Sequence, residues 1–138
     1  MFLLDTNVVS ELRKVRLGKA DTRVATWADS VPVDRLYLSV ISIEEIEIGV
    51  LRAVRRDPAQ GMGLRTWLEA SVLPAFAGRI LPVDLDVARR GATLQVPDPR
   101  PMCDGLIAAT ALVHDLTLVT RNVADFAGTG VSLFNPWG

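Results

Sequence analysis

Short apolar runs alternate with longer amphipathic stretches along the whole chain. The apolar runs have the length of buried strands and cover residues 1–4, 36–40, 80–83, 116–120 and 131–134. Apolar residues at helical spacing predict helices over residues 6–13, 21–30, 42–56, 61–76, 84–94 and 102–114. This alternation predicts a three-layer α/β/α domain with a mainly parallel central sheet, and residues 1–138 form a single domain.

Two segments break the alternation and read as loops. Residues 15–19 are basic and contain a glycine, and Val96–Pro101 holds three prolines. The pair Asp57-Pro58 ends the helix that begins at Ser42, because the residue before a proline avoids the helical region.

The composition is that of a folded intracellular protein. Hydrophobic residues make up 49% of the 138 residues and charged residues 22%. Cys103 is the only cysteine and has no disulfide partner, which fits a reducing cytoplasm. No apolar run approaches the roughly 20 residues of a membrane span, and no secretory signal precedes the first strand. We expect a cytoplasmic protein without a membrane segment.

The charge argues against a nucleic-acid binder that uses its whole surface. The formal net charge is −1, from thirteen Arg, two Lys and 16 acidic residues. Arginine offers planar, bidentate contacts to phosphate, although its abundance also fits a GC-rich genome. The basic residues Arg13, Lys14, Arg16 and Lys19 are either phosphate contacts or a solvated loop.

Four acidic residues, Asp5, Glu45, Asp104 and Asp125, stand at the ends of predicted elements. Asp5 closes the first strand and Asp125 follows a later one, and ligands of parallel sheets bind at the carboxyl ends of strands. Each acid also has a structural alternative. Asp5 is a possible helix N-cap, although Thr6 caps equally well, Asp104 suits the first turn of a helix, and Asp125 suits a turn.

Glu45 has the strongest structural alternative. Ser42 and Glu45 match the Ser-x-x-Glu capping box, in which Glu45 turns back to the Ser42 amide. However, Gly49 lies one turn further along the same helix face and costs about 1 kcal/mol of helix propensity. That cost indicates a close approach by another group next to Glu45.

If the fold brings these four acids together, their mutual repulsion needs a bound proton or cation to relieve it. Two carboxylates about 4 Å apart repel by roughly 4 kcal/mol at an effective dielectric constant of 20. A proton or a cation relieves such repulsion, and hard cations such as Mg²⁺ or Mn²⁺ prefer carboxylate oxygens. A single histidine, His114, and a single cysteine leave little material for zinc sites or Ser-His-Asp catalysis, and no Walker motif is present.

The chain resembles PIN-domain ribonucleases, in particular VapC toxins and their FitB-like branch. The resemblance covers nearly the whole chain in order and rests on LLDTN at 3–7, SVISIEEI at 39–46 with Gly49, RILPVD at 79–84, DGLIAATA at 104–111 and TRNVADF at 120–126. It implies that Asp5, Glu45 and Asp104 are the three core metal-site acids and Asp125 a fourth, more variable one. It further implies that Asn7 and Thr120 orient carboxylates or water.

The resemblance also implies an activity and partners. Such enzymes use Mg²⁺ or Mn²⁺ to activate a water that hydrolyses RNA phosphodiesters, leaving a 5′-phosphate and a 3′-hydroxyl. They are toxins of type II toxin–antitoxin pairs, so we expect a VapB/FitA-like antitoxin whose C-terminal tail occupies the active-site groove. A homodimer, a possible larger toxin–antitoxin complex, and operator DNA bound only through the antitoxin are implied as well.

Three other functions stay open. A catalytically silent module acting with an antitoxin as co-repressor is one, although the complete set of acids argues against it. A magnesium-dependent phosphatase of the haloacid-dehalogenase type needs a second Asp where the chain has Asn7, and a late Lys that is absent. A receiver-like signalling domain needs a Lys after its last core strand, where Arg121 follows Thr120.

Overall fold

A five-stranded parallel sheet forms the centre of the computed structural model, which describes residues 1–138. Its strands are β1 (Phe2–Leu4), β2 (Leu36–Ser39), β3 (Ile80–Leu81), β4 (Thr117–Val119) and β5 (Leu133–Phe134). The spatial order is β3-β2-β1-β4-β5, and all four strand pairings are parallel. The predicted α/β class is therefore confirmed, and the sheet is wholly rather than mainly parallel.

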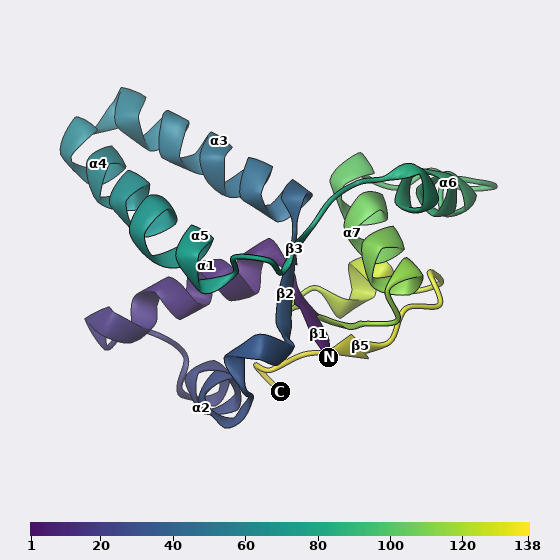
Figure 1. The fold of residues 1–138 in the computed structure, drawn as a ribbon, viewed down its shortest axis with the longest axis horizontal. Helices are drawn as coiled ribbons and strands as arrows, with labels where there is room; N and C mark the ends of the chain where they lie inside the picture. The colour runs from purple at the N-terminus through teal and green to yellow at the C-terminus, as the bar shows by residue number, and fades with distance from the viewer.

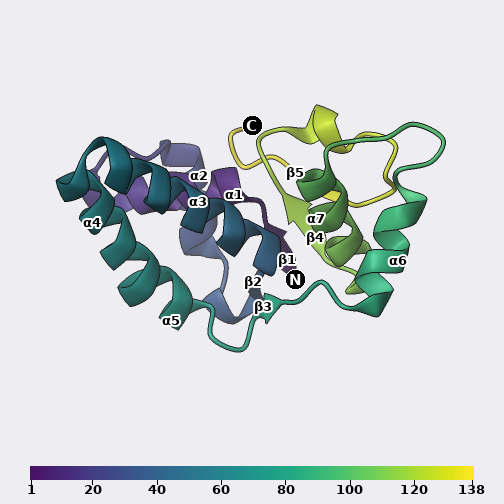
Figure 2. The ribbon, with the colours of Figure 1, turned by 90° about the horizontal axis from the view of Figure 1, so that it is seen from above.

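The helices cover both faces of this sheet. They are α1 (Thr6–Arg13), α2 (Thr22–Ser30), α3 (Val40–Arg56), α4 (Pro58–Trp67), α5 (Leu73–Ala75), α6 (Leu85–Thr93) and α7 (Met102–Val113). Single-turn 3₁₀ segments lie at Lys14–Leu17, Val33–Arg35 and Val123–Phe126, and a π-helical segment at Leu68–Val72 joins α4 to α5. In Figure 2, α1 to α5 lie on one side of the sheet and α6 and α7 on the other.

The two faces of the sheet are buried in separate cores because strand side chains alternate. Leu4 of β1 packs with α1, α2, α3 and the π-helical segment, in a core that also holds Val119 of β4. Leu3 and Leu118, the preceding residues of the same two strands, pack against α7 and Phe126 on the opposite face. Burial on both faces explains why the strands read as continuous apolar runs.

The helix starts differ from those predicted by the sequence pattern. α3 begins at Val40 rather than Ser42, because Ser39 is its N-cap and accepts a hydrogen bond at Oγ from the Ile41 amide (3.0 Å). α4 begins at Pro58 rather than Gly61, because Asp57 caps it and proline suits the first helical position. The predicted basic loop 15–19 forms in part a 3₁₀ turn.

α3 and α4 form a hairpin that extends beyond the sheet (Figure 1). Gly61 allows these helices to touch, since a Cβ atom there would lie 2.5 Å from the Cα of Val54. None of the helices, α3 included, is both long enough and apolar enough to cross a membrane.

The strand order places a ligand-binding position between β1 and β4. After β1 the chain builds β2 and β3 on one side, and it then crosses back to build β4 and β5 on the other. Ligands of open α/β sheets bind at such a switch point, outside the carboxyl ends of the strands. Asp5 directly follows β1 and Thr120 directly follows β4, so both lie at this position.

Candidate functional site

Asp5 is the buried centre of the candidate site. Its backbone N–H continues the sheet by donating to the Val119 carbonyl (2.9 Å), and the residue is only 7% exposed. Its Oδ1 accepts from the Thr6 amide (2.8 Å), so Asp5 is the N-cap of α1 and Thr6 is not. Its Oδ2 accepts from the Thr120 hydroxyl (2.8 Å). The Asp5 carboxylate therefore caps α1 with one oxygen and lies at the switch point of the sheet with the other.

Burial raises the pKa of the Asp5 carboxyl above its ordinary value. The hydrogen bonds from Thr120 and Thr6 favour the charged form and oppose this rise in pKa. The negative charge of Asp125 adds to it. The balance of these effects leaves a carboxylate that binds a proton or a cation more readily than an exposed aspartate does.

Thr120 and Asn7 connect Asp5 to the loop after β4. The buried Thr120 hydroxyl also accepts from the Asn122 amide (3.0 Å), which leaves its own proton for Asp5. The Asn7 amide nitrogen lies 3.4 Å from both Asp5 Oδ2 and Thr120 Oγ1. Its carbonyl oxygen accepts from the Arg121 amide (3.4 Å). These contacts fix the orientation of the Asp5 carboxylate.

Glu45 is held by Thr6 and not by a capping box. A capping box needs its serine at the N-cap, and the N-cap of α3 is Ser39 while Ser42 is the third residue of the helix, so the capping-box interpretation of Glu45 is wrong. Instead the Thr6 hydroxyl donates to Glu45 Oε1 (2.7 Å), with Ser42 Oγ 3.0 Å from the same hydroxyl. The expectation of a close neighbour at Gly49 is also wrong, since no atom lies within 4 Å of a Cβ built there.

Asp104 lies in the first turn of α7 without capping it, and its carboxylate accepts no hydrogen bond from the protein. Burial raises the pKa of this carboxyl, and the negative charges of Asp5, Asp125 and Glu45 raise it further, while Arg100 lowers it. Charge repulsion therefore links Asp104 to the three other predicted site residues. Burial also raises the pKa of the neighbouring Cys103 thiol, and the charge of Glu45 adds to this rise.

Asp125 is exposed on the 3₁₀ segment after β4. The next residue, Phe126, is buried in the core on the α7 side of the sheet and anchors the segment. The charge of Asp125 adds to the rise in the pKa of both Asp5 and Asp104, so this exposed acid acts on both of them.

The oxygen donors of this site match a hard divalent cation in kind. In this conformation, however, no three Asp, Glu, His or Cys side chains lie close enough together to hold a metal ion. The charges of Asp5, Asp125 and Glu45 act on Asp104, and that of Asp125 acts on Asp5, without a closed set of ligands.

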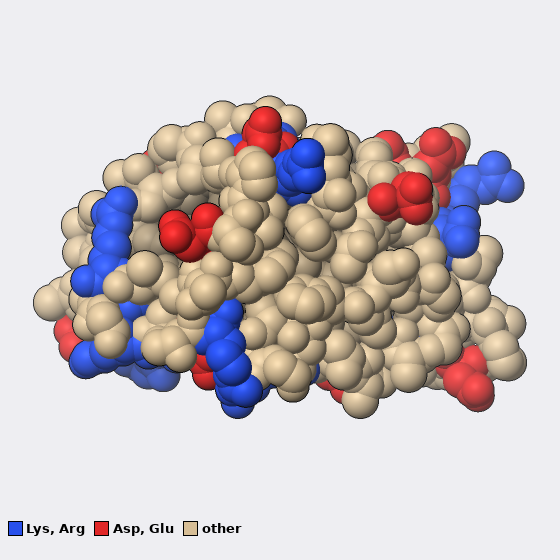
Figure 3. All heavy atoms as spheres, turned by 90° about the horizontal axis from the view of Figure 1, so that it is seen from below, with Lys and Arg blue, Asp and Glu red and all other residues tan.

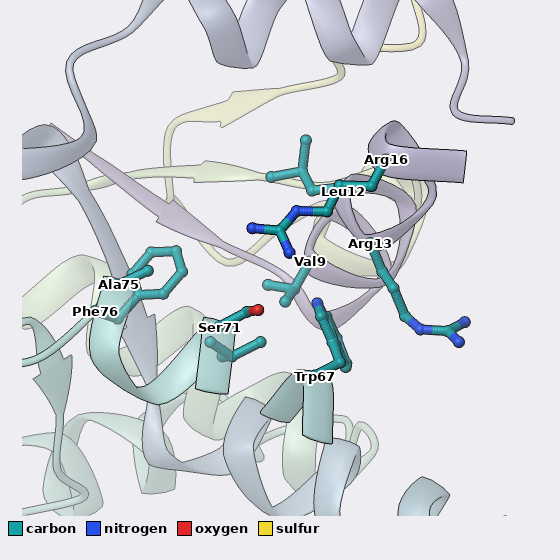
Figure 4. A pocket seen from close by; sticks show the side chains of 9 residues that line it. Val9, Leu12, Arg13, Arg16, Trp67, Ser71, Ala75 and Phe76 are labelled. Atoms are coloured by element: carbon teal, nitrogen blue, oxygen red, sulfur yellow. The ribbon is translucent and has the colours of Figure 1, made fainter. Parts of the chain in front are cut away.

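Two pockets adjoin the site along α1. One of about 220 Å³ is lined by Thr6, Glu45, Gly49 and Trp67, among others. The other, of about 190 Å³, contains none of the four acids and lies between α1 and the segment from Trp67 to Phe76 (Figure 4). Its walls are mostly apolar; the guanidinium of Arg16 extends over the pocket, and that of Arg13 points away from it on the side of Trp67 (Figure 4). Trp67 lines both pockets and is a wall common to them.

Charged side chains do not form a continuous basic surface on the face drawn in Figure 3. Lysine and arginine side chains lie there in separate groups, with uncharged surface between them. This distribution agrees with the net charge of −1.

Two residues that shape the site do not stand out in the sequence. The pattern predicts Thr6 only as a helix cap, yet its hydroxyl binds Glu45. It predicts no role for Arg100, yet the charge of Arg100 acts on Asp104. The position of Thr6 directly after Asp5 was the only signal available for either residue, because the contacts join segments far apart in the sequence.

Comparison with known proteins identifies the family. The PIN domain family model matches residues 2–129. VapC ribonuclease Y4jK from Sinorhizobium fredii is 39% identical, with 99% of this chain and 98% of the relative covered. Toxin FitB from Neisseria gonorrhoeae is 40% identical, with 99% of each chain covered.

A solved structure agrees with these relatives. FitAB bound to an IR36 DNA fragment contains a chain that superimposes with a TM-score of 0.89 at 38% identity, covering 100% of this chain and 96% of that one. Motifs, fold and full-length similarity coincide, so this chain belongs to the PIN-domain family, in the branch of the VapC and FitB toxins.

Proposed function

We propose that this protein is a metal-dependent endoribonuclease that acts as the toxin of a type II toxin–antitoxin pair. One observation carries the proposal: a buried aspartate, Asp5, at the switch point of a parallel sheet, facing the charges of further carboxylates. The similarity of the whole chain to a VapC ribonuclease and to the toxin FitB supports RNA as the substrate and supports the role of a toxin.

The four acids would hold Mg²⁺ or Mn²⁺. Asp5 and Asp104 are the strongest candidates, because burial first and the charges of neighbouring acids second raise the pKa of each carboxyl, and a bound cation would offset both effects. Glu45 and Asp125 complete the set. Such an ion, when bound, lowers the pKa of an attacking water and neutralises charge on phosphate oxygens.

The protein's own residues prepare the site for this ion. Thr120 and the Thr6 amide fix the two oxygens of Asp5, and the Thr6 hydroxyl fixes Glu45. The Asp104 carboxylate accepts no such bond. Since no three acidic groups are within ligand distance of one another, we expect the carboxylates to move together when the ion binds.

RNA cleavage tests the proposal directly. Purified protein is incubated with bulk bacterial RNA, with Mg²⁺ or with a chelator, and the new RNA ends are sequenced. We expect cuts at defined sites with 5′-phosphate and 3′-hydroxyl ends, only with metal. Asp5→Asn should abolish them, whereas the control Asp29→Asn, an exposed acid on α2, should not. Cleavage that persists with chelator or in Asp5→Asn would contradict the proposal.

Metal binding has an independent readout in thermal stability. An ion that binds only the folded state stabilises it by about 2.7 kcal/mol at a concentration of 100 times Kd. We expect Mg²⁺ or Mn²⁺ to raise the melting temperature of the wild type, and Asp5→Asn to lose this shift. An unchanged wild-type melting temperature at millimolar metal would count against the site.

A VapB/FitA-like antitoxin is the proposed partner. Its tail would reach Glu45 through the pocket beside Gly49, and a preceding segment would lie in the pocket edged by Arg13 and Arg16. We further propose a cytoplasmic homodimer, which joins the antitoxin in a larger complex that contacts operator DNA through the antitoxin. Co-purification with the product of the adjacent gene and light scattering test these assemblies.

A silent co-repressor is the second candidate, because the similar FitAB structure is bound to DNA. It predicts that the protein with its antitoxin binds operator DNA while the free protein cuts no RNA. A magnesium-dependent phosphatase would instead release phosphate from a monoester and leave RNA intact. The cleavage experiment therefore separates the ribonuclease from both alternatives, and the operator-binding and phosphate-release measurements separate the two alternatives from each other.

A further inference from the structure

Arg121 is a cation at the carboxyl edge of the sheet that pairs with no carboxylate. It lies between Thr120 and Asn122, both of which belong to the hydrogen-bond network of Asp5. The four ion pairs of the structure do not include it. Its guanidinium makes no hydrogen bond to the protein and therefore keeps its N–H donors for a ligand.

The position of Arg121 is nevertheless fixed at both ends. Its backbone N–H donates to Asn7 Oδ1 (3.4 Å), and its guanidinium lies 5.3 Å from the centre of the Trp137 ring. Trp137 is buried in the core with Leu4 and Val119, the last residues of the two central strands. A cation over an aromatic face is held electrostatically without using its hydrogen-bond donors.

Each of the other arginines with comparable contacts lacks one of these features. The Arg79 guanidinium also lies over a ring, that of Phe76, but it donates to three backbone carbonyls. Arg100 lies near Asp104, and its Nε donates to the Leu94 carbonyl. Arg13 lies over Trp67, beside a pocket without acids. Arg121 alone combines a fixed guanidinium, free donors and direct attachment to the Asp5 network.

We propose that Arg121 binds an RNA phosphate next to the one that is cleaved. An acidic site repels a polyanion, so a strand that enters it needs positive charge nearby, and arginine binds phosphate with paired N–H groups. No acid neutralises Arg121, and its backbone is tied to the residues that orient Asp5 while its guanidinium lies over Trp137, which suits a neighbouring phosphate rather than the reacting one. The inference rests on the proposed ribonuclease function and assigns a substrate contact to it.

The experiment compares wild type, Arg121→Met, Arg121→Lys and the control Arg90→Met, which removes an exposed arginine on α6. Methionine keeps an apolar cover over Trp137 but removes the charge. The substrate is the RNA that the wild type cuts, and kcat and KM are measured over a range of salt concentrations. Melting temperatures report any structural effect.

We expect Arg121→Met to raise KM about tenfold, as the loss of a charge-assisted hydrogen bond implies, with kcat and melting temperature nearly unchanged. In a plot of log kcat/KM against log salt concentration, the slope of this variant should be less steep by roughly 0.7, which corresponds to the loss of one phosphate contact on a single strand. Arg121→Lys should recover the salt dependence, because it restores the charge, but only part of the KM, because lysine lacks the paired N–H groups. Arg90→Met should behave as the wild type.

Three results would overturn the inference. If Arg121→Met has the KM and salt dependence of the wild type, Arg121 does not contact the RNA, and the proposed function is unaffected. A lower melting temperature and kcat with unchanged KM would show that Arg121 only supports Trp137. If the wild type cuts no RNA, the proposed function fails and the inference fails with it.

Discussion

The hydroxyl of Thr120 donates a 2.8 Å hydrogen bond to Oδ2 of Asp5, and both residues are buried. The two residues are 115 positions apart in the sequence and meet because β1 and β4 are neighbours in the sheet. This bond leaves Oδ2 with a fixed direction at the switch point. The orientation of the central carboxylate therefore depends on a residue from the far end of the chain.

Replacing Thr120 by valine tests this relationship, because valine keeps the shape and removes the hydroxyl. We expect RNA cleavage to fall about 10- to 100-fold, as for other groups that orient metal ligands, since Asp5 loses its fixed direction. The free energy of unfolding should fall by about 1–3 kcal/mol, because the Asn122 amide also loses its acceptor. Rates and denaturant unfolding measure both effects. Thr120→Ser should retain most activity, and an equally inactive serine variant would argue against the hydrogen bond.

Asp104→Asn should abolish cleavage and yet stabilise the metal-free protein. The pKa of Asp104 is raised in the folded state by burial and by the charges of Asp5, Asp125 and Glu45. A carboxyl with a raised folded pKa stabilises the fold below its unfolded pKa, and this contribution is lost as pH rises through the folded pKa. At neutral pH the charge therefore opposes folding. We expect the melting temperature of the variant to rise by about 2 °C at pH 7 without metal.

The same variant distinguishes the two interpretations of Asp104. A helix-dipole role in α7 predicts a lower melting temperature after the charge is removed. Cleavage at the wild-type rate would remove Asp104 from the proposed metal site.

Glu11, a buried carboxylate on α1 outside the proposed metal site, should make the stability of the fold depend on pH. Its Oε2 accepts from the Asp21 amide (2.8 Å) and its Oε1 from Lys14 Nζ (3.1 Å), and in that order these bonds lower its pKa from the ordinary 4.5. A lowered folded pKa gives stability that is present above the unfolded pKa and is lost as pH falls through the folded pKa.

Glu11→Gln should therefore lower the free energy of unfolding by about 1 kcal/mol at pH 7, and the difference should vanish in acid. Urea unfolding of both proteins from neutral to acidic pH measures it. Lys14→Met should have a smaller effect, because the lysine side chain is 49% exposed and surface ion pairs contribute about 0–1 kcal/mol. A constant difference at all pH values would exclude the ionised carboxylate as the cause.

Gly61 and Gly63 offer a matched pair within α4. A Cβ at position 61 would lie 2.5 Å from the Cα of Val54, whereas nothing lies within 4 Å of one at position 63. We expect Gly61→Ala to destabilise the protein by about 1–3 kcal/mol through overpacking of the α3–α4 hairpin. Gly63→Ala should stabilise it by up to about 1 kcal/mol through helix propensity. Thermal unfolding of both variants checks the contrast, and similar changes in both would mean that the helices do not touch at Gly61.

The sequence by itself determined the fold class and the elements that carry the acids. Apolar runs and helical spacing depend on neighbouring residues alone, so β1, α3 and α7 appear in the pattern close to their structural bounds. The positions of Asp5 at a strand end and Asp104 in a first helical turn follow from the same local rules. Local rules also led to an error, since Ser42 and Glu45 match a capping box that Ser39 makes unnecessary.

The tertiary structure alone decided which partner each polar group takes. Glu45 had a backbone amide available in the sequence pattern, but it binds the Thr6 hydroxyl because α1 and α3 lie side by side on one face of the sheet. Thr120 reaches Asp5, and Arg121 reaches Trp137, for the same reason. A hydrogen bond or a charge contact depends on distance in space, and between distant segments only the strand order β3-β2-β1-β4-β5 sets that distance.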